Sequence, residues 1–257
     1  MAAGVARGAG MIGGLLAAIG FLTRVPVPPR VFDDPRAQVQ SLAWYPLVGL
    51  LLGGVLAVLA WMLHGAPPLL AAALVLVAWV ALTGALHLDG LADSADAWVG
   101  GLGDRARTLQ IMKDPRCGPL GVVAIVLVLL LKFAALASLS AHDGWAHGWP
   151  ALLLAPMLAR GALTAAFLST PYVRADGLGR ALPGAPRHAC IAALALAIAA
   201  SLAWARGPGA LAVLVAVAVF ALWRRACRQR LGGMTGDTCG ALAELVETAV
   251  LVACAVG

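Results

Sequence analysis

Three aspartates stand at helical spacing in the first half of the chain, at Asp89, Asp93 and Asp96. At about 100° per residue, steps of four and three residues put the three carboxylates on one face of a helix. Like charges on one face repel, so a cation is expected among them. Mg²⁺ prefers carboxylate, water and phosphate oxygens, so the spacing favours a magnesium site. A solvated helix end, or a pathway for protons or cations, would show the same pattern.

A second set of charges, Lys113, Asp114 and Arg116, lies in a segment rich in glycine and proline, directly before an apolar stretch. The two cations could hold phosphate oxygens, and Gly118 and Gly121 would let a ligand approach the backbone closely. An ordinary basic loop beside a membrane has the same composition, so the pattern leaves both interpretations open.

Acidic residues recur near the end of the sequence. Glu244 and Glu247 stand three apart inside an apolar stretch, where ionisable groups are rare and usually functional. Asp237 precedes Glu244 by seven residues, so in one continuous helix all three would share a broad face, although Asp237 could equally cap that helix. His87, two residues before Asp89, is expected to pack or hydrogen-bond between helices rather than to bind metal.

An unusually apolar chain carries these residues. Of its 257 residues, 62% are hydrophobic and 12% are charged, about half the charged fraction of a soluble domain. A membrane-spanning helix needs about 20 apolar residues. The sequence therefore predicts one all-α membrane domain over 1–257, a bundle of about seven spans with six or eight as alternatives, after a short interfacial or re-entrant helix at 10–22. The predicted spans are 42–64, 69–90, 119–140, 149–169, 188–205, 208–223 and 239–256, with 188–205 and 208–223 forming a tight hairpin.

Basic residues predict the orientation of these spans. If the gaps between spans are assigned to alternate sides, one side receives fifteen lysines and arginines and the other receives only Arg206. The basic side is expected to be cytoplasmic, and it includes a long loop at 91–118. The fifteen are Arg7, Arg24, Arg30, Arg36, Arg105, Arg107, Lys113, Arg116, Arg174, Arg180, Arg187, Arg224, Arg225, Arg228 and Arg230; Lys132 and Arg160 fall inside spans.

The same distribution argues against a nucleic-acid partner. The net charge is +6, but only two of the 18 basic residues are lysines, and the basic residues are spread over the gaps between spans. The five cysteines show no paired spacing that would predict a zinc site or a disulfide framework. The oligomeric state is left open, with a homo-oligomer among the options.

Taken together, the motifs resemble those of the cobalamin synthase family, the adenosylcobinamide-GDP ribazoletransferases. The matching segments occur in the family's order and cover nearly the whole chain. They are FLTRVPVP at 21–28, YPLVG at 45–49, TGALHLDGLADSAD at 83–96, IMKD at 111–114 and GGMTGDT at 232–238.

The resemblance implies a multi-pass enzyme of the bacterial inner membrane that requires Mg²⁺ and works on the cytoplasmic side. It would join adenosylcobinamide-GDP to α-ribazole or its 5′-phosphate and release GMP. On this hypothesis Asp89, Asp93 and Asp96 bind Mg²⁺, and one of Asp96, Asp237 and Glu244 is the general base. Substrate phosphates would be held by Lys113, Arg116 and Arg24, with His87, Asp114 and Glu247 in supporting roles.

Two other functions would use a similar carboxylate face. A membrane phosphotransferase acting on a CDP- or polyprenyl-linked donor differs only in its substrate. A proton- or cation-coupled transporter would carry its carboxylates near the middle of the bilayer, on broken helices in two matching halves. The acidic residues here fall near the predicted cytoplasmic ends and no internal repeat is visible, so the sequence favours an enzyme.

Overall fold

The computed structural model describes residues 2–141, 145–174 and 178–257, and these are almost entirely helical, as the sequence predicted. The described residues form no β-strand; one isolated bridge joins Tyr172 and Met234. The helices are α1 (Ala2–Leu22), α2 (Arg30–Asp33), α3 (Pro35–Ser41), α4 (Tyr45–Met62), α5 (Pro68–Thr83), α6 (Leu86–Gly100), α7 (Arg105–Ile111), α8 (Pro119–Ala141), α9 (Trp149–Ser169), α10 (Arg187–Leu231) and α11 (Gly236–Val256), with 3₁₀ turns at η1 (Leu42–Trp44) and η2 (Leu178–Gly184).

Six helices within the described chain are long and apolar enough to cross a membrane, and a bent pair, α5 with α6, brings the number to seven. The predicted bundle of about seven spans is therefore confirmed, but the predicted span at 69–90 is wrong as one helix. α5 ends at Thr83, and α6 leaves it at an angle of 86°. Gly84 and Ala85 both adopt positive φ, of 64° and 57°, and this left-handed backbone stops α5.

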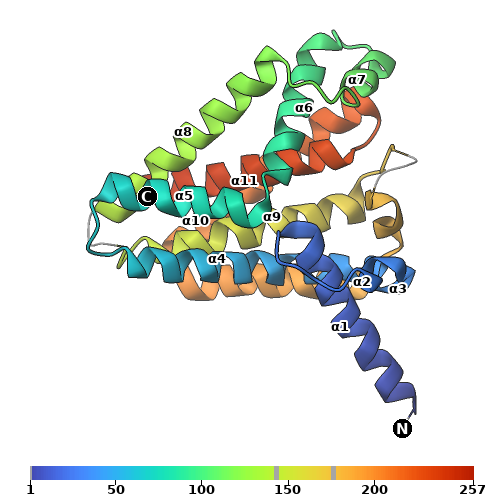
Figure 1. Cartoon of the computed structure of the whole chain (residues 1–257), viewed down its shortest axis with the longest axis horizontal. Helices are drawn as coiled ribbons and strands as arrows, with labels where there is room; N and C mark the ends of the chain where they lie inside the picture. The colour runs from blue at the N-terminus through green and yellow to red at the C-terminus, as the bar shows by residue number, and fades with distance from the viewer. Residues whose placement is uncertain (1, 142–144, 175–177) are drawn as a thin grey trace.

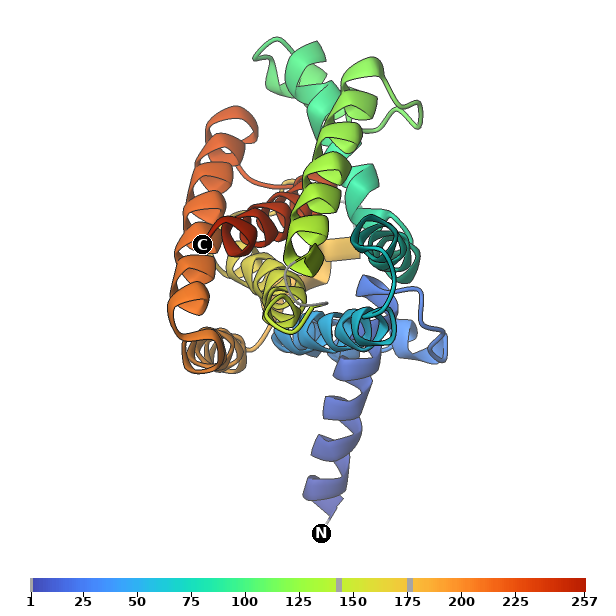
Figure 2. The ribbon, with the colours of Figure 1, turned by 90° about the vertical axis from the view of Figure 1, so that its left-hand side faces the viewer.

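α10 contains the two segments that were predicted as 188–205 and 208–223. Both count as candidate spans, Arg187–Trp204 and Pro208–Leu231, and the second continues eight residues past the predicted end. Figures 1 and 2 show the two segments running in different directions, the first nearly end-on in Figure 2 and the second across that view, so they form a bent helix and not the predicted tight hairpin. Pro208 lies at this change of direction. A proline inside a helix removes one backbone hydrogen bond and its ring clashes with the preceding turn, which accounts for the bend.

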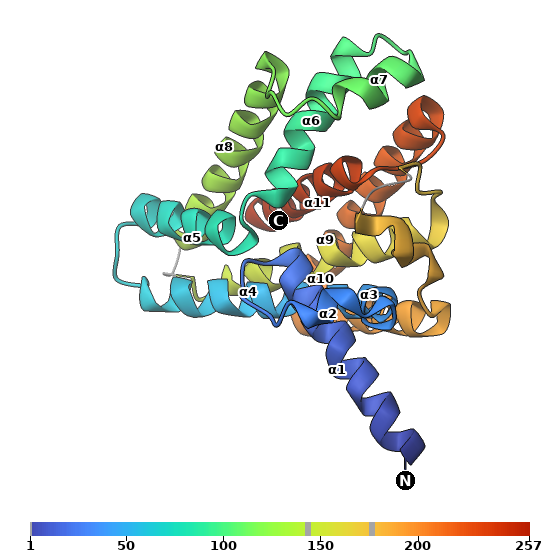
Figure 3. The same cartoon turned by 45° about the vertical axis from the view of Figure 1, so that its right-hand side comes forward.

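α9 is the central helix of the bundle. Nearly all its side chains are buried, and it packs against α4, α10 and α11. Figure 3 shows α4 and the first part of α10 below α9, and α11 on its other side. α4 approaches closely because it carries glycine at two positions of the contact: a Cβ at Gly49 would lie 2.7 Å from the carbonyl carbon of Pro156, and one at Gly53 would lie 2.8 Å from the Cα of Leu153.

Replacing Gly49 by alanine is expected to destabilise the protein by about 1–3 kcal/mol, because the added methyl group overpacks the contact between α4 and α9. The matched control is Gly54→Ala on the same helix, where an added Cβ would meet nothing within 4 Å. Thermal unfolding of the purified protein in detergent measures both. Equal Tm values for the two variants would show that α4 and α9 do not pack as described.

The N-terminal helix is longer than the predicted 10–22. α1 begins at Ala2, and its apolar part, Met11–Leu22, is too short to count as a span. Figures 1 and 3 show its first turns extending away from the other helices. Ala18 and Leu22, near its end, are buried in the bundle, so α1 is anchored there.

The segment 91–118, predicted as a long cytoplasmic loop between spans, is largely helical in the structure. α6 continues to Gly100, and a short helix, α7, follows. Asp104 caps α7 by accepting a hydrogen bond from the backbone N–H of Arg107 at 2.8 Å. The segment is therefore a largely helical connection between α6 and α8.

Candidate active site

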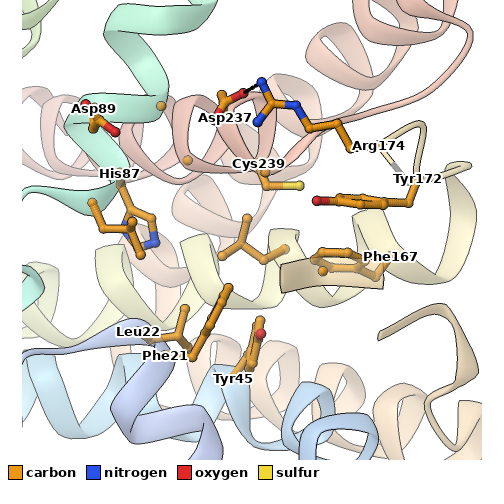
Figure 4. A pocket seen from close by; sticks show the side chains of 16 residues that line it. Phe21, Leu22, Tyr45, His87, Asp89, Phe167, Tyr172, Arg174, Asp237 and Cys239 are labelled. Carbon is orange, nitrogen blue, oxygen red and sulfur yellow. Dashed lines mark ion pairs between the residues drawn. The ribbon is translucent and has the colours of Figure 1, made fainter. Parts of the chain in front are cut away.

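A cavity of about 320 Å³ lies where α1, α4, α6, α9 and α11 meet. Figure 4 shows Phe21, Tyr45, Phe167 and Tyr172 around it, with Asp237 and Arg174 on the opposite side from Phe21 and Tyr45. The complete lining is Phe21, Leu22, Tyr45, Leu86, His87, Asp89, Gly90, Leu163, Phe167, Tyr172, Arg174, Gly179, Gly236, Asp237, Cys239 and Gly240. One wall of the cavity is thus apolar and aromatic, and another carries charges of both signs.

Two of the sequence motifs meet at the charged wall because glycines allow α6 and α11 to touch. A Cβ at Gly90 of α6 would lie 2.7 Å from the backbone oxygen of Asp237, and a Cβ at Gly240 of α11 would lie 3.2 Å from the Cα of His87. Thr235 caps α11 reciprocally with Thr238, which fixes where this helix starts. The backbone contact holds Asp89 and Asp237 beside the same cavity.

Asp237 is paired with Arg174, whose Nη2 lies 2.9 Å from its Oδ2. The same Nη2 also donates to the backbone oxygen of Met112 at 2.9 Å. Asp93 is half-buried and within electrostatic range of Asp89, Asp237 and Arg174. Three acidic side chains from two helices therefore gather around one arginine.

Asp96, predicted as a metal ligand and as a candidate base, is engaged elsewhere. Its carboxylate accepts hydrogen bonds from the backbone N–H groups of Gly118 at 2.7 Å and Gly121 at 2.9 Å. Gly118 directly precedes α8 and Gly121 lies in its first turn, where backbone N–H groups have no partner inside the helix. Asp96 thus fixes α8 against α6, and the structure does not bring it to the cavity.

The predicted phosphate-binding residues are exposed and lie outside the cavity lining. Arg116 forms a bidentate pair with Asp114, at 2.9 and 2.7 Å. Hydrogen bonds from the Arg116 side chain and backbone lower the pKa of Asp114 to about 2, so this pair keeps its charges at physiological pH. Lys113 is exposed, and the side chain of Arg24 lies across Gly84 at the bend between α5 and α6.

Glu244 and Glu247 face the interior of the bundle instead of the aspartates. Both contact Lys132 of α8, at 2.6 and 2.5 Å, and Glu247 also pairs with Arg160 of α9. All four side chains are at least 95% buried. Two cations and two anions make a neutral set, which we call the buried ion network. The prediction of Glu244 as a candidate base finds no support in this geometry.

The buried ion network reaches the cavity through one residue. Nη2 of Arg160 lies 3.4 Å from Nδ1 of His87, and His87 lines the cavity. On the side of α8 the ammonium group of Lys132 lies 4.9 Å from the centre of the Trp79 ring, a cation–π contact.

Comparison with known protein families shows which family the chain belongs to. The family model described as cobalamin-5-phosphate synthase matches residues 14–255. The chain belongs to this family.

Curated relatives agree with the family match along almost the whole chain. Adenosylcobinamide-GDP ribazoletransferase of Stutzerimonas stutzeri is 56% identical over 93% of this chain and 96% of its own. The proteins of the same name from Pseudomonas fluorescens and from Pseudomonas aeruginosa PAO1 are 56% and 55% identical, over 91% and 94% of this chain and 96% and 97% of theirs. No solved structure shows significant similarity to the chain.

The predicted set of magnesium ligands does not form a closed site in this cobalamin-5-phosphate synthase family member. Within 2–141, 145–174 and 178–257, no three His, Cys, Asp or Glu side chains are arranged to hold a metal ion. Asp89 lines the cavity and Asp93 lies within electrostatic range of it, whereas Asp96 binds the start of α8. Two carboxylates still fit Mg²⁺, which usually takes one or two together with water and substrate phosphate.

The sequence did not reveal Arg174 as a residue of the candidate site. It was counted only among the basic residues that predict orientation. It reaches the site because 171–173 pairs with Met234: Val173 N donates to Met234 O, and Met234 N donates to Pro171 O, both at 2.9 Å. Met234 is 61 residues after Val173 and 63 after Pro171, and no local pattern in the sequence signals this pairing.

Proposed function

We propose that the protein is an adenosylcobinamide-GDP ribazoletransferase, which joins adenosylcobinamide-GDP to α-ribazole or its 5′-phosphate and releases GMP. Membership of the cobalamin-5-phosphate synthase family and the names of the relatives support this. The observation that carries it is the meeting of α6 and α11 at a cavity with Asp89, Asp237 and Arg174 in its lining. Transfer between a diphosphate and a hydroxyl group requires such a combination of carboxylates and a cation.

In the proposed reaction, a ribose hydroxyl oxygen of α-ribazole forms a bond to the phosphorus attached to the corrinoid. The bond from this phosphorus to the oxygen of GMP breaks, and GMP leaves with the bonding electrons. The hydroxyl proton passes to the carboxylate of Asp237. Of the three predicted candidates for this base, Asp237 is the one that lines the cavity; Asp96 binds the backbone of α8, and Glu244 belongs to the buried ion network.

The cations are proposed to hold the phosphate oxygens. Arg174 lines the cavity and is the cation nearest the proposed base. Lys113 follows Met112, whose backbone oxygen binds Arg174, so its exposed side chain starts beside the charged wall. Arg116 and Arg24 remain candidates for a substrate large enough to extend beyond the cavity.

Asp89 and Asp93 are the residues proposed to hold Mg²⁺. Their carboxylate oxygens are the ligands this ion prefers, and their mutual repulsion favours a bound cation. Bound there, Mg²⁺ would neutralise charge on the diphosphate.

We place the protein in the bacterial inner membrane with this site toward the cytoplasm. Two observations support this: the helices are apolar enough to span, and the basic residues fall overwhelmingly on one predicted side. The carboxyl end of α6 and the start of α8, where Asp96 binds the backbone N–H groups of Gly118 and Gly121, belong to that predicted side. A transporter is less well supported, because the family and the relatives are named for an enzyme and the interior charges are paired.

Purified protein given adenosylcobinamide-GDP and α-ribazole is expected to release GMP and form the cobalamin product only when Mg²⁺ is present. Removal of the ion with EDTA should stop turnover, and added Mg²⁺ should restore it. Product formation is followed by chromatography. If folded protein forms no product, the proposed reaction is excluded; if product forms equally well after EDTA treatment, Asp89 and Asp93 do not act through a metal ion.

A further inference from the structure

The aromatic and the charged residues of the cavity lie on different sides of it. Two pairs of stacked rings, Phe21 with Tyr45 and Phe167 with Tyr172, have centroids 6.2 and 5.9 Å apart. Asp89, Asp237 and Arg174 gather on the other side (Figure 4). A ligand that fits must therefore have a flat apolar part and a polar part that bears the reacting group.

We propose that this cavity binds the aromatic base of the acceptor nucleoside, and that His87 hydrogen-bonds the free ring nitrogen of that base. The inference rests on the proposed function, because it takes α-ribazole as the acceptor. The base, a dimethylbenzimidazole, is planar and apolar and has one unsubstituted nitrogen that accepts a hydrogen bond. With the base between the rings, the attached ribose lies toward Asp237.

The size of the cavity favours the acceptor over the corrinoid. About 320 Å³ is at the lower end of the range of small-molecule sites, roughly 300–1,000 Å³. A nucleoside is of this scale, whereas a corrin macrocycle with its amide side chains is much larger. The corrinoid of the donor must therefore lie outside this cavity.

His87 is oriented for this role by the buried ion network. The guanidinium group of Arg160 carries only donors, so at 3.4 Å its Nη2 donates and Nδ1 of His87 accepts. The hydrogen of the neutral ring is then on Nε2. In the part of the chain that the structure describes, Nε2 has no hydrogen-bond partner, and the side chain is 4% exposed and lines the cavity. Nε2 remains accessible from the cavity, where it can donate a hydrogen bond to a ligand that accepts one.

The test compares α-ribazole with its analogue in which the free ring nitrogen is replaced by a carbon, so that the base becomes an indole. The wild-type protein is expected to bind α-ribazole about tenfold better than the indole analogue, as for one lost buried hydrogen bond. His87→Leu should lose this discrimination in KM, and His87→Gln, which keeps an N–H donor, should retain part of it. If His87→Leu discriminates as the wild type does, His87 does not contact the ring nitrogen.

A second pair of variants tests the cavity without changing His87, in case that substitution impairs folding. Phe167→Leu should raise KM for α-ribazole about fivefold or more, since stacking on an aromatic ring contributes roughly 1–3 kcal/mol per base, and leave KM for adenosylcobinamide-GDP within twofold. Phe220→Leu, outside the cavity lining, is the matched control. A rise in KM for the corrinoid alone would assign the cavity to the donor and overturn the inference. Wild-type protein that makes no product from either acceptor would instead refute the proposed function.

Discussion

Replacing Asp237 by asparagine is expected to lower kcat by about 10²–10⁴-fold, the range for loss of a general base. Asparagine has the same shape but cannot take the hydroxyl proton at neutral pH. It also removes the negative charge that pairs with Arg174 at 2.9 Å, so the arginine would be less well oriented toward phosphate. Steady-state kinetics at saturating substrate measures kcat.

Asp33→Asn is the matched control, because Asp33 is exposed on α2 and lies outside the cavity lining. It should leave kcat within about twofold, and both variants should keep the wild-type helix content by circular dichroism. If folded Asp237→Asn protein retains kcat within about threefold of the wild type, Asp237 is not the base, and Asp89 becomes the residue to test.

Replacing Lys132 by methionine is expected to destabilise the protein by about 3–5 kcal/mol, the cost of breaking a buried ion pair on one side. Glu244 and Glu247 would then have only Arg160 between them, and the network would carry a net negative charge in an apolar interior. A fall in Tm in detergent, together with a lower yield of folded protein, measures the effect.

The double variant Lys132→Met with Glu244→Gln makes the network neutral again and should recover a large part of the lost stability. Ser138→Ala, on the exposed face of the same helix, is the control and should change Tm by little. If Lys132→Met is as stable as the control, or if the double variant is less stable than the single one, the charges are not coupled as described.

The spans were predictable from sequence because a bilayer constrains composition over about 20 residues. α8 and α9 begin and end within one residue of their predicted limits. The bend between α5 and α6 was not predictable from hydropathy. Leu86 and Leu88 continue the apolar stretch, and Gly84 alone does not require a break; the left-handed backbone of Gly84 and Ala85 depends on the helices packed around it.

The site was predictable in its residue types but only partly in its geometry. Helical periodicity correctly put Asp89 and Asp93 on one helix beside each other. The same periodicity could not reveal that the N–H groups of Gly118 and Gly121 bind Asp96, because they lie more than 20 residues away. Glu244 was rightly singled out as unusual, but its partner Lys132 is 112 residues distant. The partners of these carboxylates are therefore set by how the helices pack, and a local sequence pattern does not reveal them.

The buried ion network also constrains the order in which the protein can be built. Lys132 is made first, in α8, then Arg160 in α9, and both carboxylates come later, in α11. A charge at the centre of an isolated helix costs about 2.5–3.5 kcal/mol to insert into a membrane. Until α11 is synthesised, the two cations have no anion to neutralise them. Biogenesis must therefore keep α8 and α9 out of direct contact with lipid at these positions until the helix that completes the network arrives.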